Sequence, residues 1–238
     1  YPFGVCDDIC ALAELGATAN AWLHVDACHG GMIYPFAARL GREVPPFDLG
    51  VTGVHSVSVD VHKLGYSNKG VSALLLTERT WGEFHRYRFD RWPAGHYETA
   101  SIAGSRSAGG IASAWAVMNY LGEVGYLSIA ESILDARDRL MAGIASRSGL
   151  EILGDPTAYI LCFACQDADI FAVDELMTGR GWVENRTLQP EAIHLFLDGS
   201  NRGSVDIYLS ELDECVARVR DTGGRAMERK ASYTRPSD

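Results

Sequence analysis

The chain has 238 residues, of which 47% are hydrophobic, so it is long enough to bury one large core or two modest ones. Its 21 basic and 31 acidic residues give a net charge of −10, which gives no reason to expect nucleic-acid binding. No run of 18 apolar residues predicts a membrane span, and no signal or transit peptide is recognisable. Because the sequence opens at Tyr1 rather than at a methionine, we expect it to begin inside a longer protein.

The six cysteines are sparse and irregularly spaced, which is typical of reduced thiols in a cytosolic protein. Two of them, Cys162 and Cys165, form a C-x-x-C pattern inside an apolar run that predicts a buried strand. Residues three apart on a strand face opposite sides, so the two sulfurs would not converge on a metal. We therefore expect a cytoplasmic protein with no metal site.

The first part of the chain alternates between helical and strand patterns. It predicts a helix over 8–18, a strand over 21–25, a helical turn over 35–40, and strands over 55–60 and 71–76. Strands separated by helices predict an α/β sheet covered on both faces, and the continuous apolar strand 71–76 suits the inside of that sheet.

Arginines gather after this sheet, at Arg86, Arg88 and Arg91, with acidic and aromatic residues between them. We interpret this run as a solvated helix end, with a local anion site as the alternative.

The pattern changes after Gly109-Gly110. Helices are predicted over 111–121 and 126–146, and they precede an alternation of strands and helices typical of a separate α+β unit. That alternation is predicted as strands 150–153, 158–164, 182–184 and 193–197 and helices 169–180 and 204–220. The predicted domains are residues 1–122, residues 123–225, and a tail over 226–238.

A carboxylate, Asp26, follows the apolar strand 21–25 directly, where it is costly unless something pairs with it. One interpretation is that Asp26 caps the turn before Gly30-Gly31. The other interpretation is that Asp26 pairs with a positively charged ring nitrogen of a bound cofactor, such as a protonated pyridine.

A lysine, Lys63, follows the alternating run Val57 to Val61 and precedes Gly65, which fits a turn at the top of a sheet. Ligands of open α/β sheets collect at the carboxyl ends of strands. Partial burial and a cationic partner there would lower the pKa of Lys63 and free its amine to attack an aldehyde. The alternative is a solvated surface lysine. The neighbouring His62 could donate to a cofactor phosphate or be an ordinary histidine at a strand end.

The two positions are 37 residues apart, which leaves room for one crossover and one return strand. A βαβ crossover places both strand ends at one edge of the sheet. A lysine that holds an aldehyde as a Schiff base, together with an acid that keeps a pyridine nitrogen protonated, is what a pyridoxal phosphate site requires. The pairing therefore predicts an enzyme with this cofactor.

Three stretches make a resemblance specific: HVDACHGG over 24–31, SVDVHKLGYSNKG over 58–70, and IAGSR over 102–106. They resemble the group II pyridoxal-dependent decarboxylase family, and the likeness continues through Trp115, residues 122–126 and Gly181-Trp182. Within that family the chain is most similar to the carbon–carbon lyases that split long-chain-base phosphates into a fatty aldehyde and phosphoethanolamine.

The resemblance implies a fold-type I, transferase-like fold, with part of a large α/β/α domain followed by a small C-terminal α+β domain. It also implies pyridoxal 5'-phosphate as cofactor, a small-molecule amine as substrate, and a homodimer with shared active sites. By position the resemblance implies that Asp26 pairs with the pyridine nitrogen, that Lys63 carries the cofactor and moves protons, and that Cys28 lies against the ring. It implies that His62 contacts the cofactor phosphate and that Gly104 and Ser105 reach this phosphate from the neighbouring subunit. It also implies that Lys69 and Arg106 lie near the substrate.

The chain departs from the lyase pattern at His29, Leu64 and Ala108, where leucine, tyrosine and proline are usual. The family's phosphate loop and ring-stacking histidine would belong to an upstream half. Three hypotheses follow. The first is a lyase acting on a phosphorylated amino alcohol, the second an amino-acid decarboxylase of the same fold, and the third a truncated chain without catalytic activity.

Overall fold

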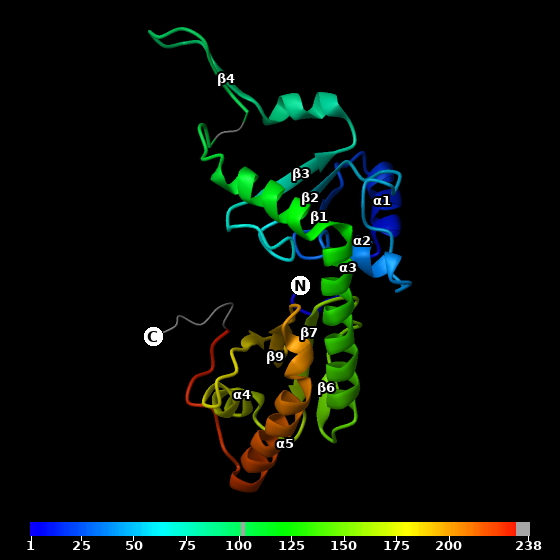
Figure 1. Ribbon diagram of the computed structural model, residues 1–238, viewed down its shortest axis with the longest axis vertical. Coiled ribbons are helices and arrows are strands. Elements are labelled where there is room, and N and C mark those ends of the chain that lie inside the picture. The colour runs from blue at the N-terminus through cyan, green and yellow to red at the C-terminus, as the bar shows by residue number, and fades with distance from the viewer. Residues whose placement is uncertain (101–102, 232–238) are drawn as a thin grey trace. The chain divides into compact units, whose positions relative to one another are not determined.

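The computed structural model describes residues 1–100 and 103–231, and the chain divides into two units. We call residues 7–36 and 44–124 the N-terminal unit, and residues 1–6, 37–43 and 125 onward the C-terminal unit. Their elements are labelled in Figure 1. The assignment of residues 1–122, 123–225 and 226–238 to two domains and a tail stays a prediction.

The N-terminal unit is built around a three-stranded sheet in the order β1-β2-β3. Helix α1 (Ile9–Thr18) precedes β1 (His24–Asp26), and the short α2 (Tyr34–Arg39) lies between β1 and β2 (Ser56–Asp60) in the chain. Strands β1 and β2 are parallel, as the predicted crossover requires. Their carboxyl ends therefore lie at the same edge of the sheet.

The third strand, β3 (Ser72–Leu76), pairs with β2 in the antiparallel direction and forms the edge of this sheet among the residues described. Leu74 and Leu75 are 41% and 46% exposed. The expectation that this strand lies inside the sheet is therefore wrong for the described chain. A continuous apolar run indicates that a strand is suited to burial, but it does not show which strands flank it.

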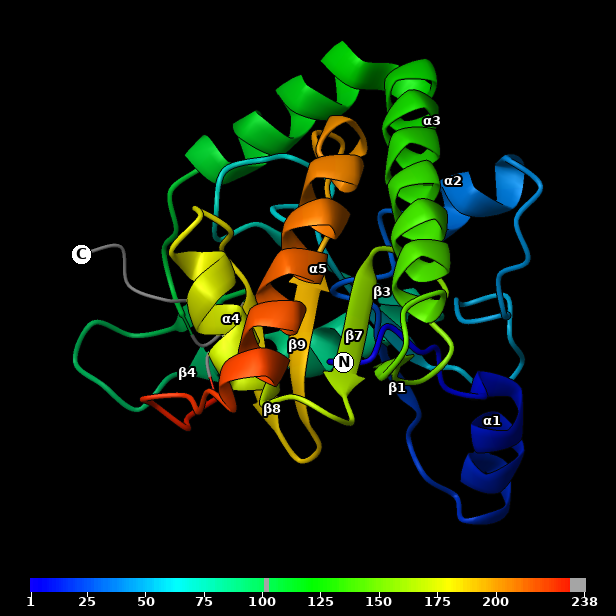
Figure 2. The ribbon, with the colours of Figure 1, turned by 90° about the horizontal axis from the view of Figure 1, so that it is seen from below.

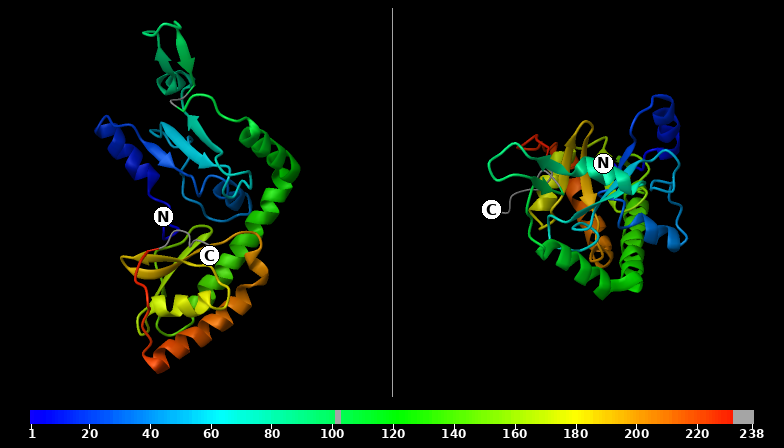
Figure 3. Two further views of the ribbon diagram at one scale, coloured as in Figure 1. Left: turned by 90° about the vertical axis from the view of Figure 1, so that its left-hand side faces the viewer. Right: turned by 90° about the horizontal axis from the view of Figure 1, so that it is seen from above.

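A hairpin that the sequence patterns did not predict follows β3. It consists of the 3-10 helix η1 (Arg79–His85), β4 (Tyr87–Phe89) and β5 (Tyr97–Thr99), and it projects beyond the three-stranded sheet (Figure 3). Arg86 does follow a helical segment, but Arg88 lies on β4, so the interpretation of the whole run as a helix end is wrong. Both arginines pair with Glu83 and Glu98, and Arg86 Nη1 lies 2.8 Å from Glu98 Oε1.

Helix α3 (Gly109–Ala145) follows, and Gly122 interrupts it with φ 55° and ψ −171°. The two helices predicted over 111–121 and 126–146 are thus the two arms of one broken helix. No helix in the described part of the chain combines the length and apolar character that crossing a bilayer demands.

The C-terminal unit contains a four-stranded antiparallel sheet in the order β6-β7-β9-β8. Helices α4 and α5 lie side by side against this sheet (Figure 2). The elements are β6 (Leu150–Ile152), β7 (Ile160–Cys165), α4 (Ile170–Thr178), β8 (Asn185–Leu188), β9 (Glu191–Phe196), η2 (Asn201–Gly203) and α5 (Val205–Thr222).

The strand predicted over 182–184 is misplaced, because β8 begins at Asn185. The N–H of Trp182 instead donates to the Met177 carbonyl at 3.1 Å, so this segment still closes the end of α4. Cys162 lies on β7 and is fully buried, whereas Cys165 at the end of that strand is partly exposed. Their different burial agrees with opposite faces of one strand.

Candidate functional site

The carboxyl ends of β1 and β2 bring together the acid and the lysine on which the cofactor prediction depends. Asp26 is the last residue of β1 and pairs in register with Ser58 of β2. Asp60 is the last residue of β2, and Lys63 follows three residues later in the turn after it. The parallel register therefore determines which side chains meet at this edge.

Asp26 is held as a carboxylate. Its Oδ1 accepts hydrogen bonds from the Cys28 N–H at 3.1 Å and from Ser58 Oγ at 3.0 Å. Partial burial acts to raise the pKa of Asp26, but these bonds and the nearby Lys63 charge outweigh it, and the pKa is lowered. The bond to Cys28 shows that Asp26 organises the turn after β1, as the structural interpretation expects. The pairing of Asp26 with a pyridine nitrogen stays a prediction.

Lys63 forms an ion pair in which Nζ lies 3.0 Å from Asp60 Oδ2, and its side chain is 22% exposed. Burial acts to lower the pKa of Lys63, but hydrogen bonds to Cys28 and Asp60 outweigh it, and the pKa is raised. The expectation of a lowered pKa is therefore wrong for this structure. A cationic partner would lower this pKa, whereas the partner of Lys63 here is the carboxylate of Asp60.

The Cys28 thiol lies near both groups, because Lys63 and Asp26 both act on its pKa. Burial, helped by the Asp26 charge, raises the pKa of the Cys28 thiol, so the thiol stays protonated at neutral pH. Cys28 thus brings a neutral thiol near an amine and a carboxylate. The three groups lie close together at this edge of the sheet.

His62 lies on the other side of Asp60. Its Nδ1 is 2.8 Å from the Val71 carbonyl oxygen, which can only accept, so Nδ1 carries the proton. Its Nε2 lies 3.8 Å from Asp60 Oδ2. The bond to Val71 fixes the ring, and the predicted contact of His62 with a cofactor phosphate stays a prediction.

Four predicted residues are not brought to this cluster by any contact seen among the described residues. Gly104, Ser105 and Arg106 lie between β5 and α3, and Gly104 has φ +68°. Lys69 is exposed in the turn before β3. Ile102 of the same motif lies outside the described residues. The roles assigned to these residues stay predictions.

Three polar residues of the site were given no role from sequence. Asp60 precedes Lys63 by three residues, a spacing that allows an ion pair across a turn. Ser58 could be recognised as a neighbour of Asp26 only from the pairing of β1 with β2. His29 is half-buried, and burial first and the Lys63 charge second lower its pKa to about 4. The presence of His29 where leucine is usual in the lyases was the sequence feature that could have indicated a role for this residue.

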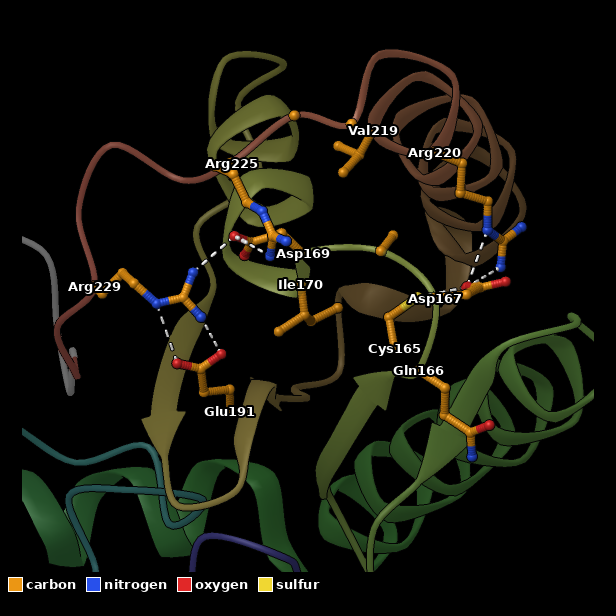
Figure 4. A pocket seen from close by; sticks show the side chains of 13 residues that line it. Cys165, Gln166, Asp167, Asp169, Ile170, Glu191, Val219, Arg220, Arg225 and Arg229 are labelled. Carbon is orange, nitrogen blue, oxygen red and sulfur yellow. Dashed lines mark hydrogen bonds and ion pairs between the residues drawn. The ribbon is translucent and has the colours of Figure 1, made fainter.

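A charged pocket of the C-terminal unit offers a contrast to this cluster. It has a volume of about 390 Å³ and contains three arginines and three acids (Figure 4). Arg229 pairs with Asp169 at 2.7 Å and with Glu191, and Arg220 pairs with Asp167 at 2.7 Å. Because these arginines are neutralised by acids, the pocket is an ion-pair network that joins α4 to the segment after α5.

Comparison with known proteins identifies the class. The model of the pyridoxal-dependent decarboxylase conserved domain matches residues 3–166. The chain therefore belongs to the pyridoxal-dependent decarboxylase family, and the predicted family and its pyridoxal phosphate cofactor are confirmed.

Several similar relatives share one name. The chain is 38% identical over 227 residues to a sphingosine-1-phosphate lyase of Arabidopsis thaliana, covering 94% of this chain and 41% of that protein. It is 33% identical to the sphingosine-1-phosphate lyase of Dictyostelium discoideum, covering 94% and 42%. The chain thus spans about two fifths of the length of these relatives.

A solved structure agrees with these relatives. The sphingosine-1-phosphate lyase of Burkholderia pseudomallei superposes with a TM-score of 0.89 at 34% identity, covering 94% of this chain and 51% of that one. Lactobacillus brevis glutamate decarboxylase superposes with a TM-score of 0.71 at 17% identity, which shows a shared fold alone. The predicted α/β fold class is confirmed.

Proposed function

We propose that this chain supplies the lysine-bearing part of a pyridoxal phosphate site in a carbon–carbon lyase that acts on long-chain-base phosphates. The observation that carries the proposal is the parallel pairing of β1 and β2, which brings Asp26 and Lys63 to one edge of the sheet, where the Lys63 charge acts on Asp26. The relatives named sphingosine-1-phosphate lyase support the choice of substrate class. The chain spans only part of their length, so activity and substrate belong to this proposal.

The side chains present fit the cofactor. The ionised carboxylate of Asp26 suits a protonated pyridine nitrogen, and the amine of Lys63 near it suits covalent attachment through Nζ. When bound, the cofactor supplies an electron sink for breaking a bond at the substrate's α-carbon. Asp26 would hold the charge on the ring nitrogen. Lys63 would hold the cofactor and, once displaced by the substrate amine, move protons.

Asp60 and Cys28 would set the protonation of Lys63. The ammonium group pairs with Asp60 and lies near the Cys28 thiol, so it must release a proton before Nζ can attack an aldehyde. Asp60 would retain the lysine near the cofactor aldehyde. His62, whose Nδ1–H is held by Val71, would donate from Nε2 to the cofactor phosphate as the imidazolium.

The remaining residues of the site complete the proposal. Lys69 and Arg106 would contact the substrate phosphate. Gly104 and Ser105 would reach the cofactor phosphate of a second subunit in a homodimer with shared active sites. The protein would act in the cytoplasm.

A second candidate is an amino-acid decarboxylase, because a probable L-aspartate decarboxylase of Thermococcus gammatolerans is 30% identical over 75% of the chain. The two reactions share the electron sink and differ in which substrate bond stands perpendicular to the ring. Product analysis separates them. Sphingosine 1-phosphate yielding a fatty aldehyde and phosphoethanolamine supports the lyase, whereas carbon dioxide from L-aspartate supports the decarboxylase.

Covalent trapping tests the site itself and also the third hypothesis, a chain without catalytic function. The chain has three lysines, Lys63, Lys69 and Lys230, so an adduct can be mapped without ambiguity. After incubation with pyridoxal phosphate and borohydride reduction, we expect one adduct, on Lys63, by peptide mass spectrometry.

The adduct should disappear in Lys63→Ala and persist in the control Lys230→Arg. Equal labelling of Lys63→Ala and the unmodified chain would refute the proposed site.

A further inference from the structure

A chain of hydrogen bonds runs along one face of β1 and β2 and ends on Asp26. Trp22 Nε1 donates to Ser56 Oγ at 2.9 Å, and Ser56 Oγ lies 2.8 Å from His24 Nδ1. His24 Nε2 lies 3.2 Å from Ser58 Oγ, which donates to Asp26 Oδ1 at 3.0 Å. Five side chains are thus connected from the amino end of the strands to the carboxyl end.

The register of the two parallel strands creates this chain. Alternate residues of a strand share one face, so His24 and Asp26 lie on the same side of β1 while Val25 is buried on the other. His24 pairs with Ser56 and Asp26 pairs with Ser58. The polar residues of one strand therefore alternate with those of its neighbour.

The two end groups of this hydrogen-bond chain, the Trp22 indole and the Asp26 carboxylate, determine which group donates in each bond. An indole N–H can only donate, and an ionised carboxylate can only accept. Ser58 has one hydroxyl hydrogen, which goes to Asp26, so Ser58 Oγ accepts from His24 Nε2. Ser56 Oγ accepts from Trp22, and its hydrogen goes to His24 Nδ1. His24 is then a neutral imidazole with its proton on Nε2.

We propose that His24 and Ser58 are positioning residues that fix the orientation of the Asp26 carboxylate toward the cofactor ring. The proposal rests on the proposed function for the role of Asp26, but the hydrogen-bond chain itself does not. The Ser58 hydroxyl and the Cys28 N–H both donate to Oδ1 of Asp26, and these two hydrogen bonds fix the plane of the carboxylate. Hydrogen bonds aligned head to tail polarise and strengthen one another, so His24 acts on Asp26 through Ser58.

The other groups near Asp26 also lower its pKa. Lys63 and Cys28 face it from the turn after β2 and the turn after β1, and the contacts of both favour the carboxylate. The contribution of Ser58 must therefore be measured with these two residues left in place. Ser58→Ala removes the donor, and Ser58→Thr keeps a hydroxyl on a β-branched side chain suited to a strand.

Nitrogen-15 NMR of the full chain, without cofactor, tests the direction of the bonds. In the unmodified chain and in Ser58→Thr, His24 should carry its proton on Nε2 at neutral pH. In Ser58→Ala, the tautomers of His24 should mix, and the pKa of Asp26, followed by its carboxyl carbon-13 resonance, should rise. A His24 proton on Nδ1, or an Asp26 titration unchanged in Ser58→Ala, would overturn the proposal.

Cofactor binding separates this inference from the proposed function. Ser58→Ala should bind pyridoxal phosphate about tenfold more weakly, because a hydrogen bond to a charged group is lost, while Ser58→Thr should bind within about twofold of the unmodified chain. If His24 has the expected tautomer but no adduct forms on Lys63, the positioning chain stands and the proposed function fails. If the adduct on Lys63 forms normally but His24 carries its proton on Nδ1, the proposed function stands and the positioning chain fails.

Discussion

At the scale of single residues, the protonation of His29 links the candidate site to the stability of the N-terminal unit. Its folded pKa is about 4, because burial and the Lys63 charge both disfavour the cation. An unperturbed histidine has a pKa of about 6.5. Between these values the unfolded chain binds a proton that the folded chain does not bind, so unfolding becomes easier as the pH falls through this window.

We predict that His29→Leu removes this part of the acid sensitivity. From pH 7 to pH 5, the unmodified chain should lose about 1 to 2 kcal/mol of unfolding free energy that the variant does not lose. Urea unfolding curves at the two pH values measure the difference. His85→Leu is the matched control, because His85 is an exposed histidine of η1. Equal acid sensitivity in all three chains would show that His29 is not neutral in the folded state.

The sequence revealed only part of the candidate site. Asp26 and Lys63 could be recognised because each follows a strand pattern, and the carboxyl ends of strands collect ligands. Ser58 and His24 could not, because their importance depends on which residues face each other across two strands. The pKa of Lys63 was predicted with the wrong sign, because its partner is the carboxylate of Asp60 and not a cation.

At the scale of elements, Gly122 is the position where the backbone itself demands a glycine. Its φ of 55° with a ψ of −171° lies in a region that residues with a Cβ scarcely adopt. The break divides α3 into the two helices that the sequence patterns predicted. Helical periodicity could be recognised on both arms, and Gly122 and Gly125 marked the break between them.

We predict that Gly122→Ala destabilises the chain by about 1 to 3 kcal/mol, because alanine must adopt the strained backbone or change the helix. Gly179→Ala is the matched control: Gly179 ends α4 with an ordinary φ of −62°, and an added Cβ meets its nearest neighbour at 3.4 Å. The control should be neutral or slightly stabilising. Urea unfolding measures both, and equal stability of the two variants would contradict the assigned role of Gly122.

Other elements escaped prediction for local reasons. The η1, β4 and β5 segment contains charged and aromatic residues and a Pro93-Ala94-Gly95 turn, and it lacks a run long enough to show a period. The strand expected over 182–184 was placed too early, because Trp182 and Val183 are apolar although the first still belongs to the end of α4. Short strands depend on partners that periodicity does not show.

At the scale of the whole chain, the alternation of strands and helices was enough to predict the α/β class. It was not enough to predict which strand edges are covered. Among the described residues, β1 and β3 are both edges of the three-stranded sheet, and β3 exposes two leucines on its two faces. An exposed apolar edge strand is a template for pairing with another chain.

We therefore predict that the chain self-associates through β3. In sedimentation velocity, the double variant Leu74→Lys and Leu75→Lys should associate at least about tenfold more weakly, because lysine on an edge strand opposes pairing. The matched control is Leu12→Lys with Leu15→Lys, which adds the same charge at leucines that are 40% and 63% exposed on α1. The control should associate like the unmodified chain. A chain that is monomeric at every concentration, or an equal effect of both double variants, would exclude β3 as the contact.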